Sequence, residues 1–235
     1  MESPVSEGIS LVIPVYNEEE SIEKSVSDAL PVLASLAQDY EIILVESGST
    51  DDSAIILDRL ARENDGVKVI HQGAKMGLGS ALKEGFGNAR HQYIFYIDGD
   101  NPFRMSEFIR GFPLLEQADI VCGYRTNRQD TPIRSIYSKA FNFLMRVLFQ
   151  VEVRDVQIGF KMMRKSIFER VHLESDSMFI DAELLIKAQK EGYTITELGV
   201  KYLGNASGKS SVTRREILKI ARDLLKYKIQ KELPK

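Results

Sequence analysis

The sequence predicts one α/β domain with a mostly parallel, Rossmann-like sheet flanked by helices on both faces. Its 235 residues suit a single large α/β domain. Over the first half of the chain, short continuous apolar runs alternate with amphipathic stretches. That alternation is typical of parallel strands that are buried on both sides. A hydrophobic content of 43% and a charged content of 28% indicate a globular protein and exclude a disordered chain.

The first half supplies the expected sheet. Its short apolar runs have the length of fully buried strands. These strand candidates are Ile9–Pro14, Glu41–Val45, Val67–Ile70, Tyr93–Ile97 and Ala118–Cys122. Two intervening stretches, Glu18–Ala37 and Asp51–Arg62, repeat apolar residues at helical spacing and are predicted to be helices.

The second half is expected to be richer in helices. Helical periodicity predicts helices over Pro132–Phe149, Ile180–Glu191 and Thr213–Lys231. A further strand is predicted over Thr194–Tyr202. The helices at 132–149 and 213–231 are amphipathic and carry basic residues.

Composition excludes several classes of protein. With 31 Lys and Arg against 34 Asp and Glu, the net charge of −3 argues against a generally basic nucleic-acid-binding protein. The single cysteine, Cys122, excludes an intrachain disulfide framework and a cysteine-rich zinc site. The acidic N-terminal residues lack the layout of a signal peptide, and no uncharged run approaches the ~18 residues of a membrane span. The expected location is therefore the cytoplasm.

Basic residues gather in two segments of this otherwise acidic chain. Lys209–Lys235 holds nine basic and three acidic residues, and Cys122–Arg170 holds ten basic and four acidic residues. Two such patches suggest an anionic ligand or surface, and the alternative is that both are solvated faces.

The clearest chemical signal is Asp98-Gly99-Asp100, directly after the strand Tyr93–Ile97. Parallel sheets bind ligands beyond the carboxyl ends of their strands. Gly99 permits a turn that brings both carboxylates toward one ligand. Two adjacent carboxylates repel unless a cation lies between them, and a divalent ion that also binds a diphosphate suits such a pair. The alternative is an ordinary acidic turn.

Other polar loops are expected at the same sheet edge. One is Val15-Tyr16-Asn17-Glu18, and another begins at Glu46-Ser47. Asn17 is also a plausible helix cap. The segment from Gly77 to Leu82 nearly matches the dinucleotide-binding GxGxxG pattern. However, its third glycine is replaced by Leu82 and it starts well after the strand, so a dinucleotide site is disfavoured.

Taken together, these residues resemble the family 2 nucleotide-sugar glycosyltransferases, which have the GT-A fold. The segments that carry this resemblance are ISLVIPVYNEEESI, EIILVESGSTDDS, MGLGSALKEGF and YIFYIDGD. Later segments look like those of polyprenyl-phosphate sugar synthases, such as dolichyl-phosphate glucosyl- and mannosyltransferases. They are DVQIGFKMMRKSIF, FIDAELLIKAQKEGYTITELGVKY and GKSSV.

The resemblance implies a division of the chain. Residues 1–212 would form the GT-A domain, with a nucleotide-binding half at about 9–123 and an acceptor half at about 124–212. Residues 213–235 would form a basic amphipathic C-terminal helix.

The resemblance also implies roles for individual residues. The nucleotide-binding positions would be Pro14, Tyr16, Asn17, Glu18, Glu46, Ser47, Gly77, Asp98 and Gly99. Asp98 and Asp100 match the DxD motif that holds Mg²⁺ or Mn²⁺, with Asn101 as a candidate third ligand. Arg125 and Arg134 match phosphate-binding arginines. The acceptor and sugar side would include Asp155, Gln157, Phe179, Asp181, Glu183 and Lys209.

The chain departs from the family pattern at three positions. Glu46-Ser47 stands where two aspartates are usual, which leaves a UDP or a GDP donor open. Asn101 stands near where a further metal ligand often follows the DxD motif, and Lys75 stands where an asparagine often precedes the Gly77 loop.

The resemblance implies metal-dependent, inverting transfer of glucose or mannose from a nucleoside-diphosphate sugar to a polyprenyl phosphate. An ionised phosphate acceptor needs no general base. A saccharide hydroxyl, the alternative acceptor, needs one. Asp155 or Asp181 could supply that base. A non-catalytic nucleotide-sugar-binding protein is the second alternative.

Both basic helices suggest peripheral contact with the cytoplasmic face of a membrane. The alternative is that the helix at 132–149 packs on the sheet and the last helix supports a homodimer.

Overall fold

The computed structural model describes residues 5–100, 102–127, 132–203, 220, 222–224 and 226–229, with only the backbone described for residues 132–135. A single mixed sheet forms the centre of the molecule, in the order β3-β2-β1-β4-β6-β5-β7. The strands are β1 (Ile9–Val15), β2 (Tyr40–Glu46), β3 (Val67–His71), β4 (Tyr93–Ile97), β5 (Ile120–Arg125), β6 (Phe160–Arg164) and β7 (Ile195–Val200).

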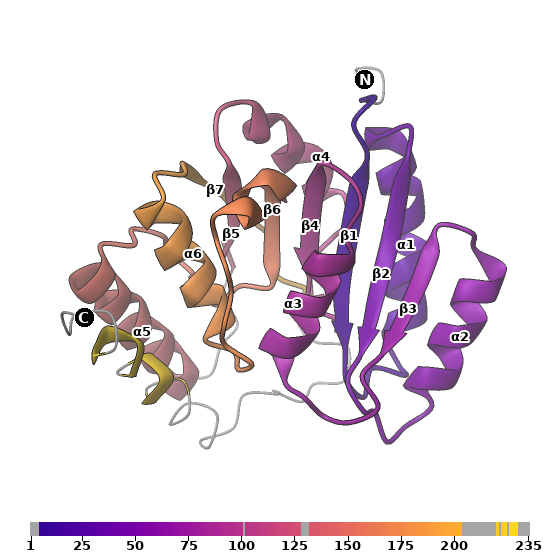
Figure 1. The fold of residues 1–235 in the computed structure, drawn as a ribbon, viewed down its shortest axis with the longest axis horizontal. Coiled ribbons are helices and arrows are strands. Elements are labelled where there is room, and N and C mark those ends of the chain that lie inside the picture. Colours follow the sequence, from indigo (N-terminus) through magenta and orange to yellow (C-terminus); the bar gives the residue numbers. More distant parts are fainter. Residues whose placement is uncertain are drawn as a thin grey trace.

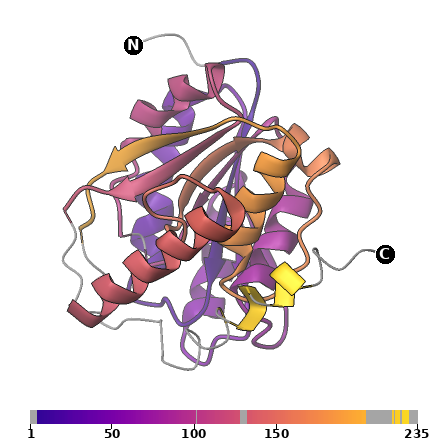
Figure 2. The same ribbon diagram turned by 90° about the vertical axis from the view of Figure 1, so that its left-hand side faces the viewer.

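Helices cover both faces of the sheet, as Figures 1 and 2 show. The α-helices are α1 (Ile22–Leu36), α2 (Ser53–Glu63), α3 (Leu78–Asn88), α4 (Glu107–Gly111), α5 (Pro132–Phe149) and α6 (Ile180–Lys190). Two 3-10 helices, η1 (Phe112–Glu116) and η2 (Lys165–Glu169), complete the described elements. Helices α3 and α6 lie on one face, and α1 and α4 lie on the other. The α/β class predicted from the sequence is thereby confirmed.

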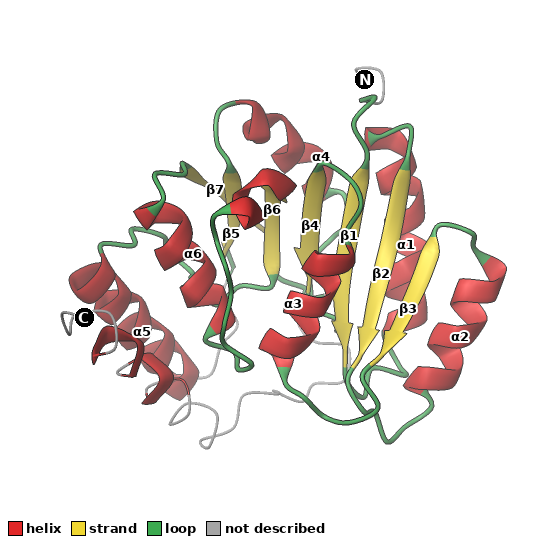
Figure 3. Ribbon diagram, viewed as in Figure 1, coloured by secondary structure: helices red, strands yellow, loops and turns green. Residues whose placement is uncertain are grey.

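The sheet is mostly parallel, as predicted, with one exception. Strand β1 pairs in parallel with β2 and β4, and β5 pairs in parallel with β7. Strand β6 lies between β4 and β5 and runs antiparallel to both. Neither β6 nor α3, which Figure 3 shows as a strand and a helix, was predicted from the sequence.

Every residue of β1 is buried, which agrees with the prediction of a sheet covered on both sides. Helix α3 approaches the sheet closely at Gly85. A Cβ atom at this position would lie 2.4 Å from Val12 Cγ1, so a larger residue would push the helix away. Helix α1 begins at Ile22 and not at Glu18 as predicted, because the residues before it pair with the loop after β2.

The predicted C-terminal helix, residues 213–231, lies mostly outside the described residues. The described positions within it, 220, 222–224 and 226–229, are helical. Leu224 and Tyr227 belong to the buried core, and the Tyr227 ring contacts Phe149 and Phe179. Part of the apolar face of this helix therefore packs on the protein. Among the described residues, no helix is at once long enough and apolar enough to cross a bilayer.

Candidate active site

Asp98 lies at the carboxyl end of β4 and packs against the backbone of Gly159, the residue before β6. Its amide N–H donates a hydrogen bond to the Gly159 carbonyl (3.2 Å), and Tyr96 Oη donates one to Asp98 Oδ1 (2.8 Å). A Cβ atom at Gly159 would lie 2.0 Å from Asp98 Cγ. Glycine at 159 is therefore required for the Asp98 carboxylate to occupy this position.

Gly99 brings the turn after β4 against the end of β1. A Cβ atom at Gly99 would lie 2.6 Å from the Pro14 carbonyl oxygen and 3.2 Å from Glu18 Cγ. The Gly99 carbonyl accepts hydrogen bonds from the hydroxyls of Ser21 (3.3 Å) and Ser25 (3.4 Å). Pro14, Glu18, Asp98 and Gly99 are thus brought together, as the sequence predicted for one sheet edge.

The pKa of Glu18 is raised at this acidic edge of the sheet. Burial raises the pKa of the Glu18 carboxyl, and the neighbouring charges of Asp98 and Asp51 raise it further, against a hydrogen bond from Ser21 that lowers it. The edge therefore carries concentrated negative charge, which favours the binding of a cation.

The loops after β1 and β2 are held together by hydrogen bonds. Asn17 has a φ of 56°, a conformation that asparagine tolerates better than most residues. Its Oδ1 accepts from the Thr50 N–H (2.8 Å), and its own N–H donates to Ser49 Oγ (3.1 Å). Asn17 therefore bridges two loops at the sheet edge, and the alternative that it caps α1 is wrong.

Glu46, a predicted nucleotide-binding residue, is buried at the end of β2 and has two hydrogen-bond partners. Its Oε1 accepts from the Ser49 N–H, and its Oε2 lies 3.2 Å from His71 Nδ1. His71 Nε2 in turn lies 3.0 Å from Asp58 Oδ1. Burial opposes ionisation of Glu46, but the hydrogen bonds from Ser49 and His71 outweigh it and lower the pKa of this carboxyl. Glu46 therefore braces the loop that follows β2.

The His71 bridge predicts a pH dependence. Its hydrogen bond to Asp58, and then the one to Glu46, raise the pKa of His71 against the effect of burial. Protonated His71 therefore stabilises the folded protein fully below about pH 6.5, the unfolded-state pKa. This stabilisation is lost as the pH rises through the folded-state pKa of His71. We expect an NMR titration to give His71 a pKa above about 6.5, and Asp58→Asn to lower it. A His71 pKa that does not respond to Asp58→Asn would contradict this interpretation.

The loop before α3 is packed against another segment of the protein. Gly77 has a φ of 98°, and a Cβ atom there would lie 2.4 Å from the Asp176 carbonyl oxygen. The Gly79 N–H donates to the same carbonyl (3.2 Å), and Ser47 Oγ accepts from the Met76 N–H (3.0 Å). These contacts give Gly77 and Ser47 packing roles, while their nucleotide-binding roles remain predictions.

Tyr16 is exposed beside this loop. The ammonium of Lys75 lies 3.7 Å from the centre of the Tyr16 ring. Lys75, a departure from the family pattern, therefore contacts a predicted nucleotide-binding residue.

Arg125 and Asp155, predicted on the acceptor side, form a bidentate ion pair. Arg125 Nε lies 2.7 Å from Asp155 Oδ2, and Arg125 Nη2 lies 3.1 Å from Asp155 Oδ1. Asp155 is 1% exposed. The pair joins the end of β5 to the segment before β6.

The residues predicted to line the sugar site are buried. Asp181 Oδ1 accepts from the Lys161 ammonium at 2.5 Å. Glu183 accepts from the backbone N–H groups of Glu174 and Ser175 and from Lys187. Phe179 lies in the core. Glu183 therefore holds the segment that covers Gly77 and Gly79, and contact of these residues with a sugar remains a prediction.

Three predicted positions fall outside what the structure describes: Asn101, the side chain of Arg134, and Lys209. Gln157 is described and half-buried. Its Nε2 atom is buried, and no hydrogen-bond partner for it occurs among the described residues. Sequence reasoning gave no role to Tyr96 or His71, and it assigned the segment from Gln157 to Lys161 only to the wall of the acceptor side. Gly159 and Lys161 lie within the segment DVQIGFK, but only their neighbours in space reveal their positions.

The pair Asp98 and Asp100 fits a hard divalent cation. Both side chains are half-buried and offer carboxylate oxygens, which Mg²⁺ and Mn²⁺ prefer. Within the described part of the chain, no group of three or more His, Cys, Asp or Glu side chains is placed to hold a metal ion. Two aspartates leave coordination positions of Mg²⁺ for other ligands, such as waters and phosphate oxygens.

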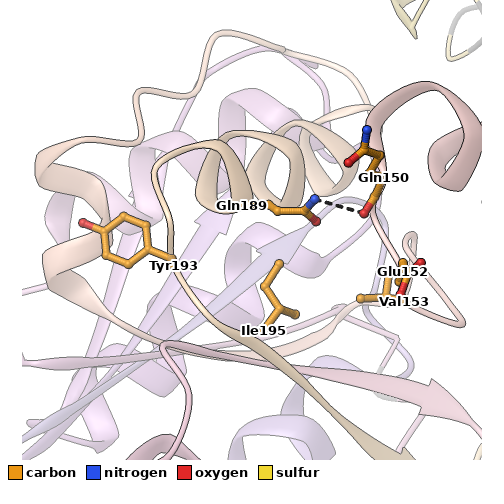
Figure 4. A pocket seen from close by; sticks show the side chains of 6 residues that line it. All are labelled: Gln150, Glu152, Val153, Gln189, Tyr193 and Ile195. Atoms are coloured by element: carbon orange, nitrogen blue, oxygen red, sulfur yellow. Dashed lines mark hydrogen bonds between the residues drawn. The ribbon is translucent and has the colours of Figure 1, made fainter.

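A separate cavity of about 300 Å³ lies between the end of α5, the end of α6 and the start of β7 (Figure 4). Its lining residues are Gln150, Glu152, Val153, Gln189, Tyr193 and Ile195. Gln189 Nε2 donates a hydrogen bond across it to the Gln150 carbonyl (2.9 Å). None of these six is a predicted site residue, so the cavity is not part of the candidate active site.

Comparison with known proteins gives a match to a family profile and to individual relatives. The profile described as Glycosyl transferase family 2 matches residues 10–172. Glycosyltransferase AglD of Haloferax volcanii is 32% identical over 93% of this chain, which spans 36% of the length of AglD. Dolichyl-phosphate beta-glucosyltransferase ALG5A of Trichomonas vaginalis is 28% identical over 96% of this chain and 74% of its own length.

Among solved structures, glucosyl-3-phosphoglycerate synthase from Mycobacterium tuberculosis has a similar fold. The crystal structure of its complex with Mn²⁺, uridine-diphosphate and phosphoglyceric acid has a TM-score of 0.75 and 19% identity. The match covers 97% of this chain and 80% of that chain. This likeness confirms the GT-A fold expected from the sequence.

Proposed function

The chain belongs to glycosyl transferase family 2, and from this premise we propose that it transfers a hexose from a nucleoside-diphosphate sugar to a polyprenyl phosphate. The observation that carries the proposal is the pair Asp98 and Asp100 at the carboxyl end of β4, beside the joined loops after β1 and β2. The relationship to a dolichyl-phosphate glucosyltransferase supports the acceptor class. The donor base is either uracil or guanine, and the sugar is glucose or mannose.

The chemistry requires two anions to approach each other. When bound, Mg²⁺ or Mn²⁺ at Asp98 and Asp100 would neutralise charge on the diphosphate leaving group. The loop residues Asn17 and Glu46, fixed by hydrogen bonds to the loop after β2, give the nucleotide side a rigid frame. The acceptor phosphate is mostly ionised at pH 7 and attacks the anomeric carbon directly, which inverts its configuration.

The surroundings of the two candidate bases favour a phosphate acceptor over a hydroxyl. Asp155 is held by Arg125 and Asp181 by Lys161, and both carboxylates are at most 4% exposed. A general base must come within hydrogen-bond reach of the hydroxyl that it deprotonates. Carboxylates buried in ion pairs meet that requirement poorly, whereas an ionised phosphate needs no base.

The proposal is tested by transfer of radiolabelled sugar. Purified protein is incubated with labelled UDP-glucose or GDP-mannose, a polyprenyl phosphate and Mn²⁺, and lipid-soluble label is measured. We expect label in the lipid fraction with one of the donors and none after addition of EDTA. Transfer to a saccharide alone would support the hydroxyl alternative. Binding of both donors without turnover would support a non-catalytic protein.

We also propose that α5 is the surface by which the protein contacts the cytoplasmic face of a membrane. Its apolar side chains at helical spacing are exposed, with 66% exposure for Ile136, 64% for Phe143 and 59% for Val147. Tyr137 and Leu144 are also exposed on this helix. The exposed basic residues Lys139 and Arg146 lie on the same helix. An apolar stripe with flanking cations suits the surface of an anionic bilayer.

The double variant Phe143→Ser with Val147→Ser is expected to bind vesicles that contain phosphatidylglycerol at least about tenfold more weakly. Full burial of an apolar side chain of this size contributes roughly 1.5–3 kcal/mol, and a side chain partly inserted in the bilayer contributes part of that free energy. Ile55→Ser is the matched control, because Ile55 is an equally exposed apolar residue on α2 (68%). Flotation measures the binding. An equal loss of vesicle binding in the α5 variant and in the Ile55 control would contradict the membrane assignment. So would a dimer in solution that only the α5 variant dissociates.

A further inference from the structure

Lys161 is a fully buried cation in the middle of the sheet. It lies on β6, where its register partners are Tyr96 on β4 and Cys122 on β5, and its side chain is 0% exposed. The ammonium donates to the Ile158 carbonyl (2.5 Å) and to Asp181 Oδ1 (2.5 Å). Asp181, in the first turn of α6, is 4% exposed.

Stability alone does not account for such a pair. Removing two charges from water costs several kcal/mol per ion, and an apolar pair of similar volume is often as stable or more stable. The neighbours of Lys161 on its own face of the sheet, Met163 on β6 and Cys122 on β5, are fully buried, so the site would accommodate an apolar side chain. The pair therefore calls for a role beyond packing.

Two short routes connect Lys161 to Asp98. The carbonyl that Lys161 holds belongs to Ile158, the residue immediately before Gly159, and Gly159 is the surface on which the Asp98 carboxylate rests. The second route passes through Tyr96. Its ring centre lies 5.5 Å from the Lys161 ammonium, and its hydroxyl donates to Asp98 Oδ1.

Asp181 determines where the ammonium points. Its carboxylate accepts a hydrogen bond from the Lys161 ammonium and compensates its charge, so that the ammonium is directed to the Ile158 carbonyl and to Asp181.

We infer that Lys161 and Asp181 are a buried positioning pair, which fixes the Ile158–Gly159 backbone under Asp98 and so sets the affinity of the aspartate pair for a divalent cation. This inference rests on the proposed function, because it assumes that Asp98 and Asp100 bind the cation. It assigns Asp181 a role through Lys161, in place of direct contact with the sugar or acceptor.

The test compares Mn²⁺ binding in matched variants. The double variant Lys161→Met with Asp181→Leu removes both charges and retains side-chain volume. The control is Glu41→Gln with Lys68→Met, which alters another ion pair with a fully buried carboxylate (2.7 Å) on β2 and β3. Free Mn²⁺ is measured by electron paramagnetic resonance in the presence of UDP, and again with GDP. Melting temperature is recorded for each protein.

We expect the Lys161 and Asp181 double variant to melt at or above the wild-type temperature and to bind Mn²⁺ about 10- to 100-fold more weakly, as loss of groups that orient metal ligands does. The Glu41 and Lys68 control is expected to keep wild-type Mn²⁺ affinity. If the double variant does not fold, Asp181→Asn, which is isosteric, is measured in its place with a several-fold loss expected.

Wild-type Mn²⁺ affinity in the folded Lys161 and Asp181 variant would overturn the positioning role and leave the proposed function intact. An equal loss in the Glu41 and Lys68 control would also overturn it. Wild-type protein that binds Mn²⁺ no better than Asp98→Asn with Asp100→Asn would overturn the proposed function, and this inference with it.

Discussion

Asp100→Asn is expected to lower metal-dependent sugar transfer by about 10²- to 10³-fold. A bound cation stabilises charge on the leaving group by several kcal/mol, and each 1.36 kcal/mol is about a factor of ten in rate. Replacing a carboxylate with an amide removes half of the negative charge that the aspartate pair supplies. Initial rates at saturating donor, measured over a range of Mn²⁺ concentrations, check the prediction.

Asp65→Asn is the matched control for this substitution. Asp65 is exposed in the turn before β3, at the opposite end of the strands from Asp100. The control is expected to retain wild-type rates. An Asp100→Asn protein that folds and still transfers sugar at the wild-type rate would refute the role of Asp100 as a metal ligand.

Gly159→Ala is expected to reduce transfer by about 10²-fold with little change in fold. The new Cβ atom would lie 2.0 Å from Asp98 Cγ, so the carboxylate must leave its position. A displacement of about 1 Å in a positioned catalytic group can cost that much. Gly159 is not in the left-handed region of backbone conformation, so alanine brings no backbone strain there. The loss is therefore expected to come from displacement of Asp98.

Gly87→Ala provides the comparison for Gly159→Ala. Gly87 lies on α3, and a Cβ atom there would have nothing within 4 Å. This variant is expected to keep full activity and to be as stable as the wild type or up to about 1 kcal/mol more stable. Mn²⁺ affinity and melting temperature are measured for both variants. Wild-type affinity in Gly159→Ala would show that Asp98 tolerates the added methyl group.

The strands of the parallel half could be predicted because each of their short apolar runs contains at most one charged residue. Tyr93–Ile97 and Pro132–Phe149 have the predicted bounds, and most other elements differ by a few residues at their ends. Strand β6 could not be recognised in this way, because two of its five residues, Lys161 and Arg164, are basic. The charge of the buried Lys161 is compensated by Asp181, which is distant in sequence.

Helix α3 was missed for a related reason. Its glycines at 79 and 85 lower helix propensity and drew attention to a ligand-binding loop. In the structure they permit close contact, Gly79 with the Ser175–Asp176 backbone and Gly85 with Val12 on β1. Local propensity alone could not identify this helix, because the reason for each glycine is a neighbour from another part of the chain.

The sequence could predict which residues of the candidate site lie at the carboxyl edge of the sheet. Strand order and direction place Pro14, Glu18 and Asp98 together, and the carboxyl ends of apolar runs can be read from sequence. The partners of Asp155 and Asp181 could not be predicted. Arg125 contacts Asp155 from the end of β5, and Lys161 on β6 contacts Asp181 on α6; such pairing follows from tertiary packing.

Because β6 pairs directly with β4, the position of Asp98 does not depend on the length of the chain between β5 and β6. Backbone pairing between β4 and β6 places Gly159 beside Asp98, whatever the number of residues that connect β5 to β6. That connection carries α5 and leaves and rejoins the sheet at fixed points. Insertions, deletions or exchange of the α5 segment between relatives are therefore expected to leave Gly159 in place beside Asp98.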